Sequence, residues 1–372
     1  VVGAGIGGAT AAREMAQQGA RVLLVDRAAF PRYKVCGCCL NAHATSLLRD
    51  AGFGDLLTTS EASPIHNFRL AAKGRNATVA VPPGSVALSR TVLDNALVEA
   101  AIKAGAVFLD ETTAHMDSSA EDFHTLRIST SQGEHHIRSK ILIASDGLSQ
   151  GILRELDDHP IAPQENSHIG AGVLLDDSSA DYEHGTIYMA CGTGGYVGLV
   201  RLGNGQLNVA AALNPKCIRE KGGLSEAAHS IMTEAGFSCP SSVADAQWRG
   251  TPPLTRRAPT VSGHRFFVIG DAAGYVEPFT GEGMASALSS ANAVAQIALE
   301  GVHDFDTNLI DAWTKTHRQL TRRSYRRCRL IASALRRPRL VGMAVGILGL
   351  APQLAAPVIK RLNEATHFER KC

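Results

Sequence analysis

Hydrophobic residues along this chain follow two different periods, and segments of the two kinds alternate in order. Apolar runs at 21–26, 141–144 and 266–269 each lie close to glycines and to a stretch of helical periodicity, as in strand–helix–strand units. By contrast, 64–89 and 168–213 contain short alternating stretches separated by Gly, Asn, Asp and Pro, which is typical of antiparallel strands. This order predicts an α/β fold with an α+β insert, in which a doubly wound domain is interrupted by an antiparallel sheet.

The patterns also predict where the domains begin and end. The expected doubly wound domain is discontinuous, and the sheet domain is inserted into it in two pieces. A helical C-terminal cap completes the chain. The expected ranges are 1–63, 90–160 and 262–311 for the doubly wound domain, 64–89 and 161–261 for the substrate-sheet domain, and 312–372 for the cap.

The last seventy residues combine helical periodicity with an unusual charge. No acidic residue occurs in 312–363, which holds about twelve Lys and Arg, so the rest of the chain carries a net charge of about −10 against +2 overall. The uncharged segment 340–359 is long enough for a membrane span, but its glycines and prolines disfavour a straight one. We favour two helices capping the substrate cavity, with peripheral membrane contact through 312–363 as the alternative and a true span last.

Composition places the chain among large globular proteins. It has 372 residues, 45% hydrophobic and 19% charged, enough to bury the core of one large domain or two intertwined ones. Its eight cysteines and lack of a secretory leader favour reduced thiols and a cytoplasmic location. Cys36, Cys38 and Cys39 have no second paired cluster to complete a tetrahedron, so no metal is expected. Nucleic acid is not expected as a partner, because no recognition motif accompanies the C-terminal arginines.

The N-terminal segment carries Gly3-x-Gly5-x-x-Gly8 between an apolar run and a helix-forming stretch. Gly3 permits a tight turn, Gly5 lets the backbone approach a pyrophosphate, and Gly8 allows close helix packing. Asp26 ends the second strand about twenty residues on, where a carboxylate accepts hydrogen bonds from a ribose diol. Together these features predict a Rossmann-type dinucleotide site. The chain opens inside its first strand, so residues before Val1 are expected to be missing.

Later motifs specify the dinucleotide. They are Arg90 before a helix, Asp146-Gly147 after a strand, and Gly270-Asp271 followed by Gly281-x-Gly283 at the start of a long helix. With these motifs the chain resembles the FAD-dependent monooxygenase superfamily with the p-hydroxybenzoate hydroxylase fold, and within it the geranylgeranyl-reductase-like and flavin-halogenase-like branch. The resemblance runs from Val1 to about Glu300. It implies a three-layer ββα core, tightly bound FAD as the resident nucleotide, and NADH or NADPH as a transient electron donor.

The resemblance assigns roles to individual residues. It implies that Asp271 binds the ribityl chain of the flavin, that Arg90 reaches the pyrophosphate, and that N–H groups of Gly281–Met284 lie by the pyrimidine side of the ring. The alternatives are a helix N-cap for Asp271 and a solvated surface side chain for Arg90. The full set of expected cofactor-binding residues is Gly3, Gly5, Gly8, Asp26, Arg27, Cys36, Gly37, Arg90, Asp146, Gly147, Gly270, Asp271, Gly281, Gly283 and Met284.

Three residues are candidates for the chemistry: Cys36, Lys34 and Tyr196. Lys34-Val35-Cys36-Gly37 matches the basic residue followed by Cys-Gly that the reductase branch carries, which implies that Cys36 lies beside the flavin. Cys36 is then either an inert wall or a proton donor, depending on whether Lys34 or the local field lowers its pKa. Tyr196 corresponds to the tyrosine of the Tyr-x-Trp-x-Phe-Pro motif of lipid reductases, although the tryptophan and proline are absent here. Cys38 and Cys39 receive no role beyond packing.

The reaction favoured by the sequence is NAD(P)H-dependent monooxygenation of a hydrophobic aromatic or polyketide-like natural product. The alternative is flavin-dependent reduction of C=C bonds in isoprenoids or other lipids. Gly274 stands where aromatic hydroxylases usually carry His, so the phenol hydroxylase subgroup fits imperfectly. A flavin halogenase is disfavoured, because Trp248 and Trp313 are far apart and no W-x-W-x-I-P signature occurs. A flavin-binding module without turnover is the last alternative.

Overall fold

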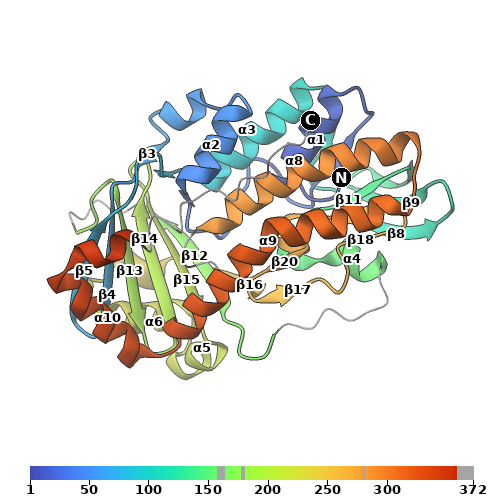
Figure 1. Cartoon of the computed structure of the whole chain (residues 1–372). Helices are drawn as coiled ribbons and strands as arrows, with labels where there is room; N and C mark the ends of the chain where they lie inside the picture. The colour runs from blue at the N-terminus through green and yellow to red at the C-terminus, as the bar shows by residue number, and fades with distance from the viewer. Residues whose placement is uncertain (157–163, 177–180, 278, 280, 358–372) are drawn as a thin grey trace.

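A computed structural model describes residues 1–156, 164–176, 181–277, 279 and 281–357. The molecule has two halves in space, and a parallel sheet forms the centre of one of them (Figure 1). Val2 joins its two strand pairs through parallel bridges to Val25 and Ala144. Its strands are β1 (Leu23–Val25), β7 (Val107–Leu109), β11 (Leu142–Ala144), β19 (Phe266–Val268) and the antiparallel edge β18 (Ser262–Gly263). Segments far apart in sequence therefore meet in one layer.

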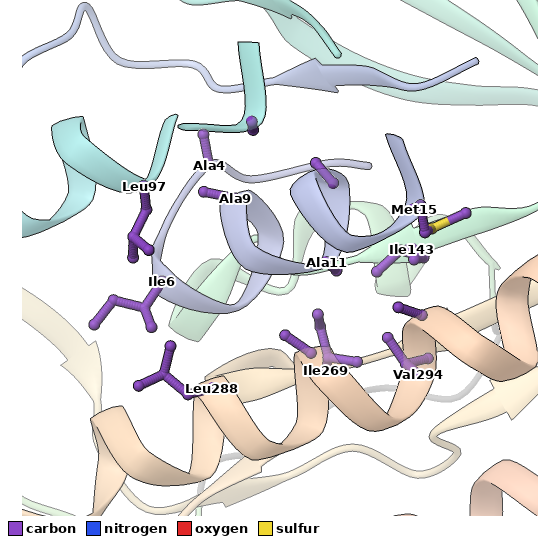
Figure 2. Packing of buried hydrophobic residues seen from close by; sticks show 14 of the residues in the cluster. Ala4, Ile6, Ala9, Ala11, Met15, Leu97, Ile143, Ile269, Leu288 and Val294 are labelled. Carbon is purple, nitrogen blue, oxygen red and sulfur yellow. The ribbon is translucent and has the colours of Figure 1, made fainter. Parts of the chain in front are cut away.

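Three helices cover one face of this sheet: α1 (Ile6–Gln17), α3 (Arg90–Lys103) and α8 (Glu282–His303). Figure 2 shows Ile6 of α1 and Leu288 of α8 pointing toward each other in this core. Small residues let α1 approach closely. A Cβ added at Gly8 would lie 1.8 Å from the carbonyl oxygen of Gly3, so only glycine fits there.

The other face of the parallel sheet packs against a three-stranded antiparallel meander and a short helix. Buried Leu126, Leu142, Ile152 and Val268 make up part of the core between them. The elements are β8 (Thr113–Ser119), β9 (His124–Thr130), β10 (Gly133–Ser139) and α4 (Gly151–Leu156). The three layers confirm the fold class predicted from the sequence.

A seven-stranded sheet forms the second half of the molecule. Its order is β16-β12-β15-β14-β13-β4-β5, and all pairings are antiparallel except that of β13 with β4. One face is covered by α6 (Leu224–Ala235), and the other turns toward the parallel-sheet half and α10. The strands are β4 (Asn67–Ala72), β5 (Arg75–Ala80), β12 (Ile169–Leu175), β13 (Thr186–Gly192), β14 (Gly195–Arg201), β15 (Leu207–Leu213) and β16 (Arg249–Pro253).

Two helices follow α8 and connect the halves. α9 (Asn308–Leu335) begins before the expected start of the cap and lies against α8 and β18, while α10 (Pro338–Leu350) lies beside β4 and β5 (Figure 1). Trp313 is fully buried, and its indole N–H donates to the Val268 carbonyl at 3.2 Å, which fastens α9 to β19. Within the described residues, no helix is long and apolar enough to span a membrane.

The remaining elements are short. They are β2 (Cys39–Leu40), β3 (Ser63–Pro64), β6 (Val86–Ala87), β17 (Arg256–Arg257), β20 (Gly274–Tyr275), α2 (Ala42–Asp50), α5 (Pro215–Lys221), α7 (Ser242–Asp245) and four 3₁₀ turns, η1 (Asp55–Thr58), η2 (Gly147–Ser149), η3 (Gly270–Ala272) and η4 (Pro352–Ala355).

Candidate functional site

The turn before α1 faces a cluster of three cationic side chains. A Cβ added at Gly5 would lie 3.5 Å from Arg32 Nη2, 3.8 Å from Arg90 Nη2 and 3.9 Å from Lys34 Nζ. The first N–H groups of a helix are free to bind an anion, and the helix dipole favours negative charge at this end. The N-terminus of α1 and the three cations together make a cradle suited to a diphosphate.

Two buried ion pairs hold this cradle in place. Arg90 donates from Nε and Nη2 to the two carboxylate oxygens of Asp94, both at 2.8 Å, and Arg32 Nη1 lies 3.3 Å from the same carboxylate. Arg90 is only 6% exposed, so the surface-arginine alternative is wrong. Arg32 and Asp94 were missed by the sequence analysis. Positions 32, 34 and 36 share one side of an extended segment, and Asp94 follows Arg90 at helical spacing, so both signals were present.

Lys34 connects three of the motifs singled out in the sequence. Besides facing Gly5, its Nζ lies 3.8 Å from Asp271 Oδ2 and 3.6 Å from where a Cβ of Gly147 would be. Gly147 has a φ of +65°, which suits glycine. Asp271 lies within the turn η3, whose N-cap position is Ile269, so Asp271 is not the N-cap of this turn. The structure thus brings the N-terminal loop, the Asp146-Gly147 turn and Asp271 together around one ammonium group.

The two acids that end or follow strands have different surroundings. The Asp26 carboxylate accepts hydrogen bonds from the N–H groups of Ala4 at 2.8 Å and Ala28 at 3.0 Å, at the edge of the glycine turn. Asp146 Oδ2 accepts from the N–H of Ile152 at 3.1 Å, and burial raises the pKa of this carboxyl. Arg27 is exposed, and its charge favours the ionised form of Asp146.

The N-terminus of α8 is held from the opposite side by α9. Gly281 precedes α8 with a φ of +69°. Glu282 Oε1 lies 3.1 Å from Arg327 Nη2, and Tyr325 donates its hydroxyl proton to the Gly274 carbonyl at 2.6 Å. A cleft lies here, lined by Gly270, Asp271, Gly274, Tyr275, Val276, Glu282, Gly283, Ser286, Ser324, Tyr325 and Cys328. Its wall contains the motif residues Gly270, Asp271 and Gly283 together with α9, which no motif had indicated.

Comparison with protein families decides what this arrangement is. A family model described as "FAD binding domain" matches residues 1–327. The chain belongs to this FAD-binding family. The match covers the glycine loop, Arg90, Asp146-Gly147 and the segment from Gly270 to Met284, and it places the chain in the superfamily that the sequence resembled.

Curated relatives are distant but cover most of the chain. Conditioned medium factor receptor 1 of Dictyostelium discoideum is 26% identical over 332 residues, which is 82% of this chain and 64% of that protein, so the chain spans less than two thirds of its length. Digeranylgeranylglycerophospholipid reductase 2 of Methanopyrus kandleri is 28% identical over 83% of this chain and 78% of its own. Menaquinone reductase of Mycobacterium tuberculosis is 28% identical over 80% of this chain and 75% of its own.

Solved structures share the fold over almost the whole chain. A geranylgeranyl bacteriochlorophyll reductase-like protein from Thermoplasma acidophilum superposes with a TM-score of 0.79 at 19% identity, covering 99% of this chain and 96% of that one. The p-nitrophenol 4-monooxygenase PnpA of Pseudomonas putida gives 0.75 at 16% identity, covering 97% of each. At these identities the likeness concerns the fold.

The residues present fit FAD. The cradle at Gly5 provides positive charge and free N–H groups for its diphosphate, and glycine there leaves room for the ligand to approach. Asp26 lies where the ribose of a nucleotide on α1 would be, and Asp271 lies on the far side of Lys34. The helix N-terminus at Gly281–Met284 would support negative charge on the flavin ring. These individual contacts remain predictions.

The three neighbouring cysteines have unequal thiols. The pKa of Cys36 is lowered to about 5, chiefly by a hydrogen bond from the Cys38 thiol and further by the Arg90 guanidinium, against the opposing effect of burial. The pKa of Cys38 is raised well above its ordinary value because Cys36 holds the negative charge, and burial raises that of Cys39. Asn208 donates from Nδ2 to the Cys36 carbonyl at 3.0 Å and thereby links this segment to β15.

This difference predicts how the thiols react. Because the thiolate is the nucleophile, alkylation of Cys36 in the FAD-free protein by iodoacetamide should rise with pH through a midpoint near 5 and level off below neutral pH. Mass spectrometry of peptides after short exposures measures the rate at each cysteine. Cys36→Ser should remove the low-pH phase, whereas Cys239→Ser should leave it unchanged. A midpoint near the ordinary thiol value of 9.0 would contradict the prediction.

The wall of the seven-stranded sheet that faces the FAD half is largely apolar, and it contains the buried tyrosine Tyr196. Tyr196 is 8% exposed and packs edge-on against Phe279 with ring centroids 5.3 Å apart. Burial and the neighbouring Glu277 carboxylate raise the pKa of Tyr196 well above its ordinary value. Glu277 Oε1 in turn lies 2.9 Å from Nδ1 of His168, and both side chains are buried. His168 and Glu277 were missed by the sequence analysis, because 109 residues separate them.

Proposed function

We propose that the protein is an FAD-dependent reductase that saturates a C=C bond of an isoprenoid lipid or isoprenoid quinone, with NADH or NADPH as the electron donor. Two of the relatives described above are named as reductases of such molecules, a digeranylgeranylglycerophospholipid and a menaquinone. This reaction was the alternative in the sequence analysis, and the relatives favour it over monooxygenation.

The observation that carries the proposal is the apolar sheet wall with Tyr196 embedded in it. Phe68, Leu70, Met189 and Phe279 belong to the same buried cluster as Tyr196, and together they offer a surface for a hydrocarbon chain. Gly198 stands two residues after Tyr196, where the lipid reductases carry tryptophan, and the Met189 methyl lies 3.3 Å from where its Cβ would be. A flexible methionine thus fills part of the space that a tryptophan would take.

The proposed chemistry needs one proton from the protein. When bound, FAD supplies the transfer of a hydride equivalent. Saturating a C=C bond adds that hydride to one carbon and a proton to the other. Tyr196 is protonated at physiological pH, and its raised pKa makes it a weaker acid than an ordinary tyrosine. Its hydroxyl can therefore deliver the proton only as the hydride adds to the C=C bond and strongly basic negative charge develops on the other carbon. Glu277 and His168 lie behind it and can return a proton to the resulting phenolate.

Cys36 has a different part in this proposal. A pKa lowered to about 5 favours the thiolate of Cys36 at neutral pH, and a thiolate carries no proton to donate. Its charge and that of Asp94 both balance Arg90, so the thiolate helps to fix the guanidinium beside Gly5. We therefore propose Cys36 as a positioning residue and Tyr196 as the proton donor.

A single anaerobic experiment tests the function. The holoprotein is reduced with NADPH or dithionite without oxygen, and menaquinone or a geranylgeranyl lipid is then added. Reoxidation of the flavin absorbance together with a gain of two hydrogen atoms in the prenyl chain would support the reductase. With menaquinone, this gain must persist after air has reoxidised any quinol to the quinone. Failure of every prenyl substrate to reoxidise the flavin would overturn it.

Monooxygenation is the second candidate, favoured by the fold shared with p-nitrophenol 4-monooxygenase. It requires oxygen as a substrate, so the same reduced protein mixed with labelled oxygen and an aromatic compound should yield a product that carries one labelled oxygen atom. Oxygen uptake that yields only hydrogen peroxide would count against this candidate.

Replacing the proposed proton donor should slow turnover without loss of the cofactor. A general acid typically contributes at least about 100-fold to a rate, so Tyr196→Phe should lower kcat by roughly that factor. Tyr188→Phe is the matched control, since Tyr188 is likewise buried but lies on the neighbouring strand β13 and packs on the α6 side of the sheet. The measurement is the rate of anaerobic flavin reoxidation by substrate, with FAD content checked by absorbance. Equal rates for Tyr196→Phe and the parent chain would assign the proton donor elsewhere.

A further inference from the structure

Helix α10 has two apolar faces, and only one of them is packed. Val341 and Val345 are buried in the cluster that contains Tyr196. On the opposite side, four large apolar side chains are exposed to solvent: Leu340 by 43%, Met343 by 55%, Ile347 by 56% and Leu350 by 91%. At 100° per residue these four fall within an arc of about 80°, so they form one continuous stripe along the helix. We call them the α10 stripe.

Basic side chains border the α10 stripe on two sides. Arg336, Arg337 and Arg339 are exposed immediately before and at the start of α10. Lys73 and Arg75, exposed on the β4–β5 hairpin, lie against Gly342 and Gly346 of the helix, with Arg75 Nη1 2.9 Å from where a Cβ of Gly346 would be. The glycines let α10 lie close to the hairpin, which brings these two cations beside the stripe.

Helix α9, which leads into α10, carries further exposed cations and no acidic residue after Asp311. Arg322, Arg323, Arg326 and Arg329 are exposed on α9, together with Leu330, which is 73% exposed. No acidic residue occurs in the described part of the chain after Asp311. In Figure 1, α10 lies at the outer side of β4 and β5, at the end of the molecule far from α1.

We propose that the α10 stripe and its basic border dock the protein on the surface of an anionic lipid bilayer. An exposed apolar stripe bordered by Lys and Arg is the pattern of helices that lie in the membrane interface, where the apolar side chains enter the acyl region and the cations meet lipid phosphates. α10 is too short to cross the bilayer, so the contact is peripheral. Nucleic acid would pair with the arginines but would leave the apolar α10 stripe in water. An anionic bilayer accommodates both the stripe and its basic border, so lipid is the better match.

Docking in this way has a consequence for the site. The inner face of α10 contributes Val341 and Val345 to the cluster of Tyr196 and Phe279, so one helix separates the bilayer from the apolar wall of the site. This consequence rests on the proposed reductase function, because an isoprenoid substrate resides in membranes. The docking itself does not depend on it, since it follows from the exposed surface alone.

Co-sedimentation of the full-length holoprotein with vesicles tests the proposal without substrate or turnover. We expect binding to vesicles of phosphatidylcholine with phosphatidylglycerol, little binding to phosphatidylcholine alone, and weaker binding at high salt, which screens the charges. Ile347→Asp and Met343→Asp should each weaken the partition at least about tenfold, because a charge cannot enter the acyl region. Ile102→Asp is the matched control, since Ile102 is 48% exposed on α3, away from the stripe. It should bind like the parent chain.

Two further measurements keep the test decisive. Circular dichroism and thermal melting show whether each variant is folded, and Arg336→Gln with Arg337→Gln should reduce binding and its salt dependence without touching the apolar stripe. Unchanged binding of folded Ile347→Asp would overturn the proposal. The proposal would also be overturned if the parent chain did not bind anionic vesicles and was a dimer, whereas the Ile347→Asp variant was a monomer. A second copy of the chain would then cover the α10 stripe. A negative reductase assay with intact vesicle binding would overturn only the proposed function.

Discussion

Gly5→Glu is expected to purify without FAD and to bind added FAD at least about 100-fold more weakly than the parent chain, equivalent to about 2.8 kcal/mol. The backbone of Gly5 has a φ of −72°, which any residue can adopt, and the nearest side-chain atoms to an added Cβ are the cationic groups at 3.5 to 3.9 Å. The new carboxylate would pair with Arg32, Lys34 and Arg90 and would occupy the place of the diphosphate.

The same substitution should not destabilise the FAD-free protein, because an anion placed among three cations at a helix N-terminus is favourable. Thermal melting of FAD-free Gly5→Glu should therefore give a Tm at or above that of the FAD-free parent. Fluorescence titration with FAD measures the affinity. Gly54→Glu adds the same charge near Arg49 and should leave FAD binding unchanged. Normal FAD content in Gly5→Glu would show that the diphosphate lies elsewhere.

Asp94→Asn is expected to lower the free energy of unfolding of the FAD-free protein by about 3 kcal/mol. Asp94 is fully buried and takes both hydrogen bonds of Arg90 as well as the charge of Arg32. Removing one partner of a buried ion pair leaves the other charge uncompensated, which typically costs about 3–5 kcal/mol, and the remaining amide oxygen keeps part of the hydrogen bonding. Urea unfolding followed by circular dichroism provides the measurement.

FAD should partly compensate this loss, because its diphosphate would supply negative charge to the same two arginines. The difference between Asp94→Asn and the parent chain should therefore be smaller with bound FAD than without it. Glu99→Gln is the control on the same helix, where the exposed side chain of Glu99 only accepts a hydrogen bond from Asn95. Its effect should stay within about 0.5 kcal/mol. An equally small effect of Asp94→Asn would mean that water weakens the ion pairs of Asp94 with Arg90 and Arg32.

Much of the fold was predictable because its signals are local. The turn at Gly3 to Gly8, the helix that begins at Arg90 and the helix that follows Gly281 each depend on residues a few positions apart. Period and turn residues therefore located them correctly. The alternating stretches at 64–89 and 168–213 likewise became β4, β5 and β12–β15. Their merger into one sheet was also expected, but the parallel pairing of β13 with β4 was not.

The sequence predicted the motifs of the site, but it did not predict which distant side chains contact the motif residues. Lys34 was a candidate, but its position among Gly5, Gly147 and Asp271 required three separate turns to converge. His168 was passed over because its partner Glu277 comes from the loop after β20. A hydrogen bond between residues so far apart leaves no spacing that a single sequence can reveal.

By itself, the sequence determined the class of fold, the dinucleotide loop and the basic, acid-free character of the C-terminal segment. These depend on residue type and short-range period, which fix backbone conformation and polarity locally. Only the tertiary structure decided that the pKa of Cys36 is lowered, that Glu277 and His168 lie beside Tyr196, and that one face of α10 is left exposed. Protonation and exposure depend on which distant side chains share a volume, and that is set when the two sheets and their helices pack together.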